Sequence, residues 1–339
     1  ANGVTIDNCT FSGNIGGDAF IYLDTDVAHS GISIINNIFD GAITTWHLLR
    51  AGGNKTDLTI DGNSFTGSTA GTDNALIYLG VAGSNIDITD NSFSSFPSTY
   101  SPVAIQHNAS GGTRTTDLVI TGNTIDFTGF TNANEGISVR YASDVQIENN
   151  ALTGAASATS YQAGITIASV NSTGGQSVIS DNSVDGFSRG IRIQRWASGD
   201  GNSDDIEITG NTVTDGVVAT GSESSTGVGL FLAGVTNLLV EGNTVTGHAN
   251  AGVYIPATVS DGGANTITNI IIGGATATFN NFSSNTDGMN NFITTTASAQ
   301  YNWWGSATGP NHSPENTPGT GSSVSDYVDY SPWCTNSNC

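Results

Sequence analysis

The segment Leu58–Phe65, with the sequence LTIDGNSF, decides the fold, because close copies of it recur along most of the chain. Apolar and polar residues alternate, a turn follows at an asparagine, and another apolar residue stands two positions on. Similar segments are ISIINNIF from Ile32, IDITDNSF from Ile86, LVITGNTI from Leu118 and IEITGNTV from Ile206, with further copies from Val4, Val145, Ser177 and Leu238. Such self-similarity is typical of a repeat architecture.

A second alternating segment follows each copy. Examples are ALIYL from Ala75, GISVR from Gly136, GITIA from Gly164 and GIRIQ from Gly190. Alternation with a period of two indicates β-strands, and no helical periodicity separates them. The pattern therefore excludes a βαβ fold and predicts that consecutive copies stack as the coils of a solenoid.

The recurring asparagine predicts a structural ladder. Stacked side-chain amides donate and accept hydrogen bonds along a column, and asparagine also tolerates left-handed backbone. The expected ladder comprises Asn37, Asn63, Asn91, Asn123, Asn150, Asn182, Asn211 and Asn243, spaced 26 to 32 residues apart. Cys9 takes this place in the first copy, so its side chain is expected to point inward.

Two apolar columns should fill the core. The first comprises Phe11, Phe39, Phe65 and Phe93, continued by Ile125, Leu152, Val184, Val213 and Val245. The second comprises Ile6, Ile34, Ile60, Ile88, Ile120 and Ile147.

The pattern I-x-I-x-x-N-x-F followed by G-I-x-I resembles the coil of right-handed parallel β-helix proteins. The resemblance covers residues 1 to about 260, and Ile270–Phe292 adds one or two degenerate coils around Asn280 and Phe282. It implies an all-β, single-domain solenoid of ten to eleven coils over residues 1–300. Residues 301–339 would form an irregular C-terminal cap rich in aromatic residues, proline and glycine.

The tail from Tyr301 resembles the N-W-W-G…G-P…V-D-Y-S-P-W segment that closes many β-helix domains of secreted and cell-surface proteins. This resemblance implies a cap over the last coil and an extracellular or cell-surface location. An exposed last coil would leave strand edges and apolar surface uncovered. The residues expected to seal it are Trp303, Trp304, Tyr327, Tyr330 and Trp333.

Composition excludes several function classes. Seven Lys and Arg residues against 29 Asp and Glu give a net charge of −22, so a nucleic-acid partner is not expected. The longest apolar runs are far shorter than the roughly 20 residues that cross a bilayer, so membrane insertion is not expected either. Six N-x-Ser/Thr sequons are candidate glycosylation sites, at Asn8, Asn54, Asn108, Asn171, Asn281 and Asn311.

Cysteine usage leaves two interpretations open. Cys334 and Cys339 could close a small loop in an oxidising compartment, or all three cysteines could be free thiols. The first coil also lacks a visible cover, so a preceding domain or a second molecule is expected to lie on it. If a second molecule covers the first coil, such head-to-tail contacts would build a filament.

Arginines concentrate on the second strand of the middle coils. The candidate carbohydrate-binding residues are Gln106, Arg140, Tyr141, Arg192, Gln194, Arg195 and Trp196, with Gln106 and Gln194 expected in the column of Arg140. Guanidinium groups pair bidentately with planar anions such as sugar carboxylates. The alternative is that these arginines pair with acidic neighbours such as Glu135. In the first three coils, the outward face is expected to be apolar, with Ile21, Leu23, Leu49, Ile77 and Leu79.

Catalysis has less support in the sequence. The expected outward columns hold no Asp or Glu, which disfavours a glycosidase with paired carboxylates. A polysaccharide lyase that uses Arg140 or Arg192 as its base is the alternative. Asp200, Asn202 and Asp204 have the spacing of a calcium loop, but Asp205 and Asn211 stand where such loops have Gly and Glu. A solvated acidic turn is the other interpretation, and no other cofactor is expected.

These patterns together predict an extracellular or surface-displayed structural or adhesive β-helix protein that contacts polysaccharide and assembles end to end. The alternative function is that of a lyase acting on an anionic glycan at the arginine-containing face.

Overall fold

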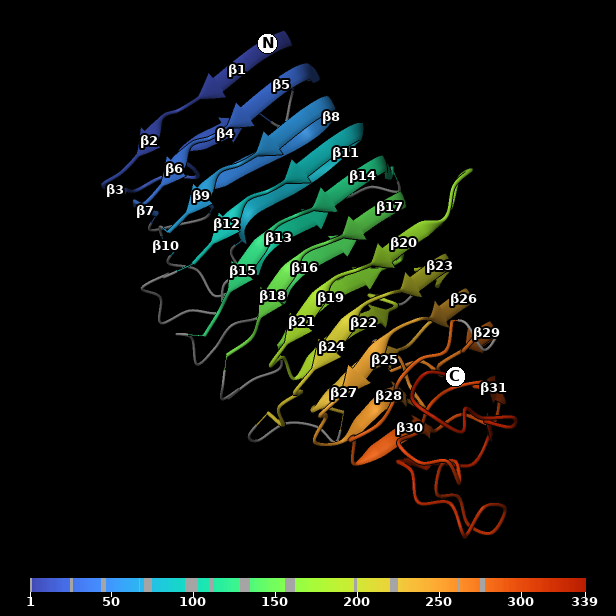
Figure 1. Cartoon of the computed structure of the whole chain (residues 1–339). Coiled ribbons are helices and arrows are strands. Elements are labelled where there is room, and N and C mark those ends of the chain that lie inside the picture. Colours follow the sequence, from blue (N-terminus) through green and yellow to red (C-terminus); the bar gives the residue numbers. More distant parts are fainter. Residues whose placement is uncertain are drawn as a thin grey trace.

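The computed structural model describes residues 2–24, 27–43, 47–66, 68–69, 75–94, 103–109, 113–128, 135–155, 162–197, 200–219, 225–260, 262–274 and 278–339. These residues form strands and turns, with no α-helix among them, and successive strands pair in parallel as the coils of one solenoid (Figure 1). The described residues contain no helix long and apolar enough to cross a membrane.

Each full coil contributes a strand to each of three faces. Sheet 1 contains β1 (Asn2–Asp7), β5 (His29–Ile35), β14 (Thr115–Thr121), β17 (Ala142–Glu148), β20 (Ser177–Ser180), β23 (Ser203–Thr209), β26 (Val235–Glu241), β29 (Ile267–Ile272), β31 (Ala297–Ser298) and β33 (Val328–Asp329). Sheet 2 contains β2 (Thr10–Phe11), β6 (Ile38–Phe39), β9 (Ser64–Phe65), β12 (Ser92–Phe93), β15 (Thr124–Asp126), β18 (Ala151–Thr153), β21 (Ser183–Asp185), β24 (Thr212–Thr214) and β27 (Thr244–Thr246).

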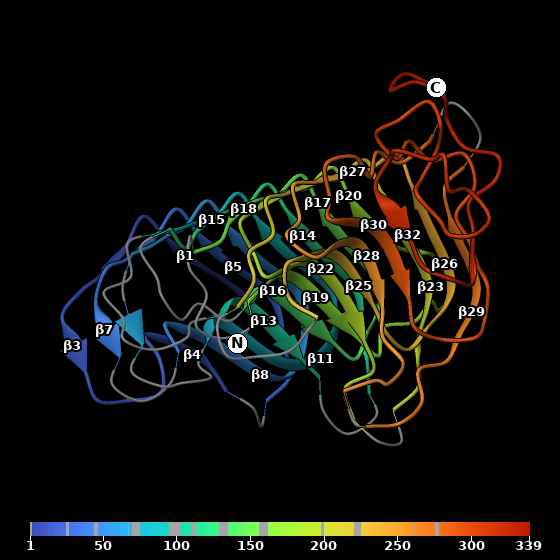
Figure 2. The same ribbon diagram turned by 90° about the horizontal axis from the view of Figure 1, so that it is seen from below.

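The third face, here called the groove sheet, faces the viewer in Figure 2. It contains β4 (Ile21–Leu23), β13 (Val103–Asn108), β16 (Glu135–Arg140), β19 (Ala163–Ala168), β22 (Arg189–Gln194), β25 (Val228–Leu232), β28 (Ala251–Ile255), β30 (Asp287–Asn291) and β32 (Ser323–Val324). The long strands β8 (Leu49–Asp61) and β11 (Ala75–Thr89) run through the corner and belong to both sheet 1 and the groove sheet. Three short strands, β3 (Asn14–Ile15), β7 (Ala42–Ile43) and β10 (Ser68–Thr69), form a separate small sheet.

The asparagine ladder lies at the corner between sheets 1 and 2. The Nδ2 of Asn91 donates to the Oδ1 of Asn123 at 3.0 Å and to the carbonyl of Ile60 at 2.9 Å, and the same Oδ1 accepts from the Asn91 backbone N–H. This pattern confirms the predicted column from Asn37 to Asn243 and continues through Asn280 to Asn302. The polar atoms of this buried corner are thereby satisfied within the protein.

The left-handed backbone at this corner belongs to the preceding residue, which corrects the expectation for the ladder asparagines. Asn36, Asp90 and Asn149 have φ near 54°, and glycine takes the same position as Gly62 and Gly122. Asn, Asp and Gly are the residues that adopt this conformation at least cost. The sequence therefore uses two adjacent residues for two tasks: one turns the chain, and the next builds the ladder.

The core contains the two predicted columns. The rings of Phe11, Phe39, Phe65 and Phe93 stack in sequence with centroids 4.6 to 4.9 Å apart. The aliphatic residues of later coils continue this column in register. The isoleucines of sheet 1 also pair coil by coil and are completely buried from Ile34 onward. Identical residues stacked at the coil spacing thus fill the interior.

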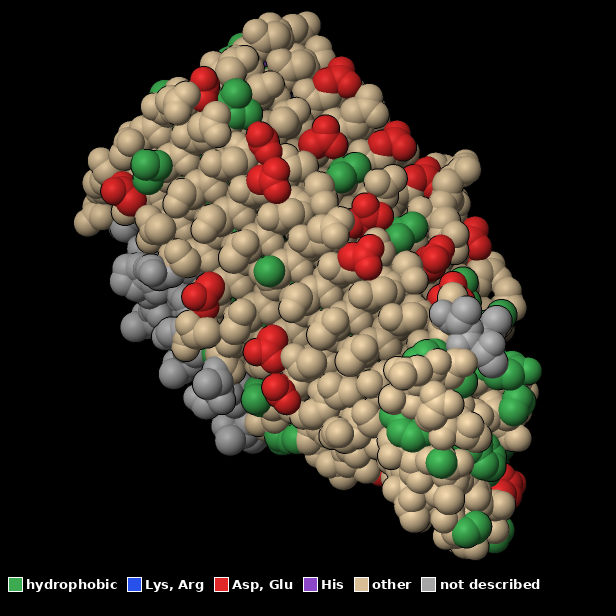
Figure 3. Space-filling view, in the orientation of Figure 1, with side chains coloured by type: hydrophobic (Ala, Val, Ile, Leu, Met, Phe, Trp, Pro, Cys, Tyr) green, Lys and Arg blue, Asp and Glu red, His purple; other side chains and the backbone are tan. Residues whose placement is uncertain are grey.

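The outer side of sheet 1 is acidic. Figure 3 shows Asp and Glu side chains spread along this face, with no Lys or Arg side chain of the described residues visible there. Asp87, Glu148, Glu207 and Glu241 lie on β11, β17, β23 and β26 of this sheet. Their like charges repel, so this side does not favour an anionic ligand.

Regular pairing extends beyond residue 300, where the sequence predicts the cap to begin. Strand β32 pairs with β30, and β33 pairs with β31. Trp304 is completely buried, with its ring centroid 5.3 Å from that of Phe282, and Tyr330 is also buried. Tyr327 is 49% exposed and does not seal the last coil as expected. The tail therefore supplies a further coil segment as well as a cover.

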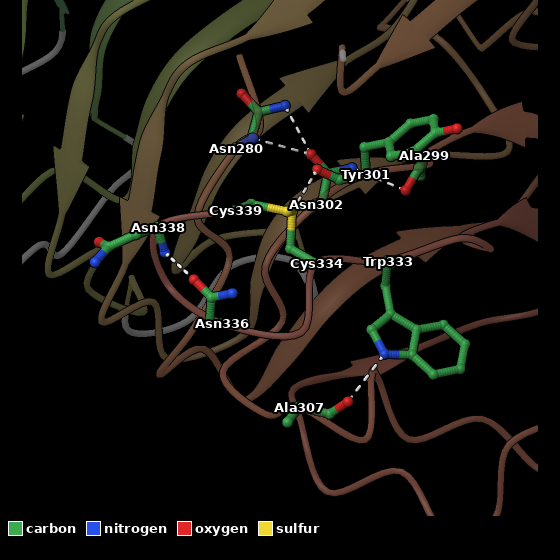
Figure 4. Close-up of a disulfide and its surroundings, with 10 residues drawn as sticks. All are labelled: Asn280, Ala299, Tyr301, Asn302, Ala307, Trp333, Cys334, Asn336, Asn338 and Cys339. Atoms are coloured by element: carbon green, nitrogen blue, oxygen red, sulfur yellow. Dashed lines mark hydrogen bonds between the residues drawn. A yellow bond between two sulfur atoms is a disulfide. The ribbon is translucent and has the colours of Figure 1, made fainter. Parts of the chain in front are cut away.

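A disulfide fastens the end of the tail. Cys334 is bonded to Cys339 beside the last ladder residue, and its backbone N–H donates to the carbonyl of Asn302 at 3.0 Å (Figure 4). The indole N–H of Trp333 donates to the Ala307 carbonyl at 3.2 Å. These contacts attach the irregular tail to the final ladder position.

The first coil differs from the last. Cys9 is exposed, contrary to the expectation that it points inward. Its backbone N–H donates to the Oδ1 of Asn37 at 2.9 Å, while its thiol does not enter the amide column. A thiol cannot replace the paired donor and acceptor of an amide, so the ladder begins at Asn37.

Candidate functional site

The register of the groove sheet decides which side chains reach solvent. Ile21, Leu49, Ile77, Ile105 and Ile137 are paired in one column and are buried in the core. The outward column contains Tyr22, Arg50, Tyr78, Gln106, Ser138, Thr166, Arg192, Phe231, Tyr254 and Asn290.

This register corrects the expected apolar patch in the first coils. Leu23 and Leu79, with the isoleucines and Leu49, lie on the inner side of the sheet or pack against the core. Gln106 is paired with Ser138 rather than with Arg140. Arg140 and Gln194 do share a column, with Ala168 between them. In the first three coils the error is a one-residue shift, which reverses the side of the sheet that a side chain faces, whereas at Gln106 the shift is two residues and keeps the side.

A bend at Gly136, near the start of β16, brings the carboxylate of Glu135 to the outer side of the sheet. A Cβ at Gly136 would lie 2.6 Å from the Cδ2 of Leu152 in the core, so glycine is required there. Both Gly136 and the next residue, Ile137, therefore face inward, and the simple alternation breaks. Glu135 consequently projects on the outer side, where sequence reasoning expected no Asp or Glu.

Glu135 joins two of the predicted arginines. Its carboxylate accepts a hydrogen bond from the Arg192 guanidinium and lies 3.9 Å from the Arg140 guanidinium. The Arg192 Nε donates to the Thr166 hydroxyl at 3.2 Å. The short side chains of Ser138 and Thr166 leave room for Arg192 to reach two coils back. The pairing with Glu135 that the sequence offered as an alternative is therefore present.

Arg140 retains hydrogen-bonding capacity despite this pairing. Its guanidinium lies over the Trp196 ring, 3.3 Å from the centroid, and its buried Nε has no hydrogen-bond partner among the described residues. Burial lowers the pKa of Arg140 below its ordinary value, and the nearby Glu135 carboxylate opposes this change. A planar anion that approaches this side chain would find a desolvated donor already held in position.

The neighbouring coils add aromatic surface. Arg189 donates from Nε to the Ser225 carbonyl at 3.0 Å and covers the Phe231 ring at 4.2 Å. The Phe231 and Tyr254 rings are stacked with centroids 5.9 Å apart, and the Phe292 centroid lies 5.1 Å from that of Tyr254. Phe292 is 53% exposed and presents an apolar face to the solvent.

These side chains line a single groove of about 1330 Å³ over β13 to β30. Its lining includes Gln106, Glu135, Arg140, Arg189, Arg192, Gln194, Trp196, Phe231, Tyr254 and Phe292, and the segment Pro256–Ser260 forms one wall. Three arginines and one glutamate give this lining a charge of +2, within a chain whose net charge is −22. Positive charge is thus concentrated where aromatic rings are also available.

Five of the seven predicted binding residues line this groove, and two do not. The Tyr141 hydroxyl donates to the Oδ2 of Asp200 at 2.7 Å at the sheet corner, and Arg195 lies beside Gly234 outside the groove lining. The predicted binding set did not include the lining residues Arg189, Phe231, Tyr254 and Phe292. The position of Arg189 directly before the glycine that recurs at the start of these strands was the available signal.

The groove does not contain a pair of carboxylates. Glu135 is the single acidic side chain among the described residues that line it. Both geometries of the usual glycosidase mechanism require two carboxyl groups within about 10 Å of each other. The described lining therefore does not support hydrolysis by that mechanism.

The three candidate calcium ligands each have other hydrogen-bond partners. Asp200 accepts hydrogen bonds from Tyr141 and from the Ala197 backbone, whereas Asp204 accepts from Thr236. The amide of Asn202 donates to the carbonyl of Thr266 at 3.0 Å. Among the described residues, no group of three or more His, Cys, Asp or Glu side chains has an arrangement that could hold a metal ion.

The six sequons differ in accessibility. Asn8, Asn54 and Asn311 are exposed, whereas Asn108, Asn171 and Asn281 are half-buried. The Oδ1 of Asn171 accepts from the Ser143 hydroxyl at 2.6 Å. Glycosylation stays a prediction, and it is sterically easiest at the three exposed sites.

Comparison with known proteins identifies the family. No curated protein and no solved structure gives a significant match to the chain. Residues 84–272 match the family model described as a right-handed β-helix region. Because this match spans more than half of the 339 residues, the chain belongs to the right-handed β-helix family.

Proposed function

We propose that this protein is an extracellular or surface-displayed β-helix rod that binds an acidic polysaccharide in the groove. The observation that carries the proposal is the positive groove lining in a strongly acidic chain. Arg140 and Arg192 provide donors for sugar carboxylates, while Gln106 and Gln194 provide amides for hydroxyl groups. Trp196 and Phe292 provide exposed rings for the apolar faces of sugars, and the groove follows the rod axis as a linear polymer would.

The test is a binding titration with polygalacturonate, alginate and hyaluronan, with dextran as a neutral comparison. We expect binding of at least one acidic glycan and a weakening at higher salt, because charge pairing is screened. Arg140→Ala should weaken that binding about tenfold or more, since it removes a charge-assisted donor from a desolvated site.

Arg195→Ala is the matched control, because Arg195 lies on the same coil as Trp196 but outside the groove lining. Equal affinity for dextran and the acidic glycans, or equal losses in the two arginine variants, would contradict the proposal.

A polysaccharide lyase is the second candidate, supported by the lowered pKa of the buried Arg140. A neutral Arg140 would take the proton next to the sugar carboxylate. The electrons of that C–H bond form a C=C bond, the glycosidic C–O bond breaks, and the leaving oxygen gains a proton. Absorbance of the unsaturated uronate product should appear with wild-type protein and disappear in Arg140→Lys. Binding without any such absorbance would leave the rod as a binding protein only.

End-to-end assembly remains part of the proposal. Residues of the first coil, including Val4 and Cys9, are exposed at one end of the rod. Negative-stain electron microscopy with and without reductant tests it: regular filaments are expected, and dispersed single rods at high concentration would contradict it.

A further inference from the structure

A second aromatic and cationic surface lies on the groove sheet, in the coils that precede the groove. Its members are Tyr22, Arg50 and Tyr78, which are paired side by side on β4, β8 and β11. Tyr22 is 43% exposed, and the Arg50 guanidinium lies 5.3 Å from the centroid of its ring. Arg50 also lies 3.5 Å from the carboxylate of Asp18. We call these three residues the upstream platform.

Tyr78, on β11, is held in place by its neighbours. A Cβ at Gly80 would lie 2.8 Å from the Cε1 of Tyr78, so the ring occupies the space that a side chain would otherwise fill. The His47 ring stacks on Tyr78 with centroids 4.5 Å apart and an interplanar angle of 10°. The His47 Nδ1 is fixed by the backbone of Ala75. Tyr78 is therefore positioned before any ligand arrives, which lowers the entropic cost of binding.

The upstream platform continues directly into the groove. Tyr78 is paired with Gln106, which is itself a groove-lining residue. The same outward column then passes through Ser138, Thr166 and Arg192 to Phe231 and Tyr254. Eight coil steps of about 4.8 Å separate Tyr22 from Tyr254, which gives a track of about 40 Å along the rod. The first three of these eight steps, from Tyr22 to Gln106, lie outside the groove.

We propose that the upstream platform is a further binding site for the same acidic glycan, so that a long chain occupies the platform and the groove at once. This inference rests on the proposed function of the groove. A sugar ring would stack on the exposed ring of Tyr22 and contact the uncovered edge of Tyr78, and Arg50 would pair with a sugar carboxylate once it exchanges Asp18 for the ligand. Contacts on both parts of one polymer reinforce each other, so affinity rises with chain length up to the length of the track.

The experiment compares size-fractionated polygalacturonate of two lengths. Short fragments of about 20 Å fit within the groove, and long fragments of more than about 40 Å reach both parts. We expect the wild type to bind the long fragments more tightly than the short ones. Tyr22→Ala and Tyr78→Ala should each weaken binding of the long fragments about three- to tenfold and leave the short fragments unaffected.

Tyr327→Ala is the matched control, since Tyr327 is similarly exposed but lies in the C-terminal tail. Circular dichroism and thermal unfolding of the variants show whether the coil remains folded, and Tyr22→Phe should retain the length effect because it keeps the ring.

The possible failures are distinguishable. If short and long fragments bind the wild type equally, and Tyr22→Ala behaves like Tyr327→Ala, the groove stands and the upstream platform is not a binding site. If neither length binds, the groove proposal itself is contradicted, and the platform inference falls with it.

Discussion

The ladder corner and the groove sheet are built from the same coils but follow opposite rules. At the ladder corner every coil from Asn37 to Asn302 supplies the same residue, and each amide bonds the next. Along the outward column of the groove sheet, neighbouring coils supply different residues, such as Ser138, Thr166, Arg192 and Phe231. Repetition is therefore used for stability, and variation is used for the site.

The reason is geometric. Identical side chains stacked at the coil spacing satisfy each other, as the asparagines and phenylalanines do. An outward position has no such partner in the core, so its residue is free to differ from coil to coil. A substitution at the ladder corner should therefore mainly lower stability, whereas a substitution in the groove should mainly change glycan affinity.

The largest expected effect is at the ladder. Asn150 accepts from the backbone and side chain of Asn123 and donates to Asn182 and to the carbonyl of Ile120. Asn150→Ala leaves several buried groups without partners, and we expect the free energy of unfolding to fall by about 3 to 5 kcal/mol. Urea unfolding followed by circular dichroism measures this change.

The adjacent Asn149 provides the control, because it is exposed and has φ of 55°. Asn149→Gly keeps the left-handed conformation accessible and should change stability little. Equal losses of unfolding free energy in the two variants would show that the ladder hydrogen bonds contribute no more to stability than an exposed turn residue does.

A smaller effect is expected at His248, which lies between β27 and β28. Burial lowers the pKa of His248 from 6.5 to about 4. The folded state thus favours the neutral ring of His248. The contribution of this ring to the free energy of unfolding is fully present above pH 6.5 and is lost as the pH drops toward 4. The full loss is about 3 kcal/mol.

Thermal unfolding between pH 7.5 and pH 4 measures this dependence. In His248→Gln the decrease over that range should be smaller than in the wild type. An identical pH profile would mean that another group controls the acid sensitivity.

The smallest effect on stability is expected in the groove. Glu135→Gln removes one negative charge beside Arg140 and Arg192, but its amide oxygen can still accept a hydrogen bond from Arg192, so the free energy of unfolding should fall by about 1 to 2 kcal/mol. The same change raises the lining charge from +2 to +3, so affinity for an acidic glycan should increase about threefold.

Glu207→Gln makes the same substitution on sheet 1 and should leave glycan affinity unchanged. Isothermal titration calorimetry of both variants tests the comparison. Weaker glycan binding by Glu135→Gln would show instead that the carboxylate contacts the ligand.

Local patterns in the sequence were sufficient to predict the ladder, the phenylalanine column and the isoleucine column. These features repeat, so each copy supports the interpretation of the others. The outward register of the first coils was predicted incorrectly, because Ile21, Tyr22 and Leu23 are all apolar or aromatic and do not identify the buried side. The pairing of Ile21 with Leu49, and of Leu49 with Ile77, shows that Ile21 is on the buried side of the sheet.

The sequence by itself determined the coil, its period, the solenoid fold and the concentration of arginines in the middle coils. Only the tertiary structure placed Glu135 between Arg140 and Arg192, brought Trp196 over Arg140, and joined Phe292 to the same groove. The physical reason is that repeats encode contacts between equivalent positions, whereas the groove depends on contacts between non-equivalent positions of different coils. Those contacts depend on the bend at Gly136 and on the reach of long side chains, which the repeat pattern does not encode.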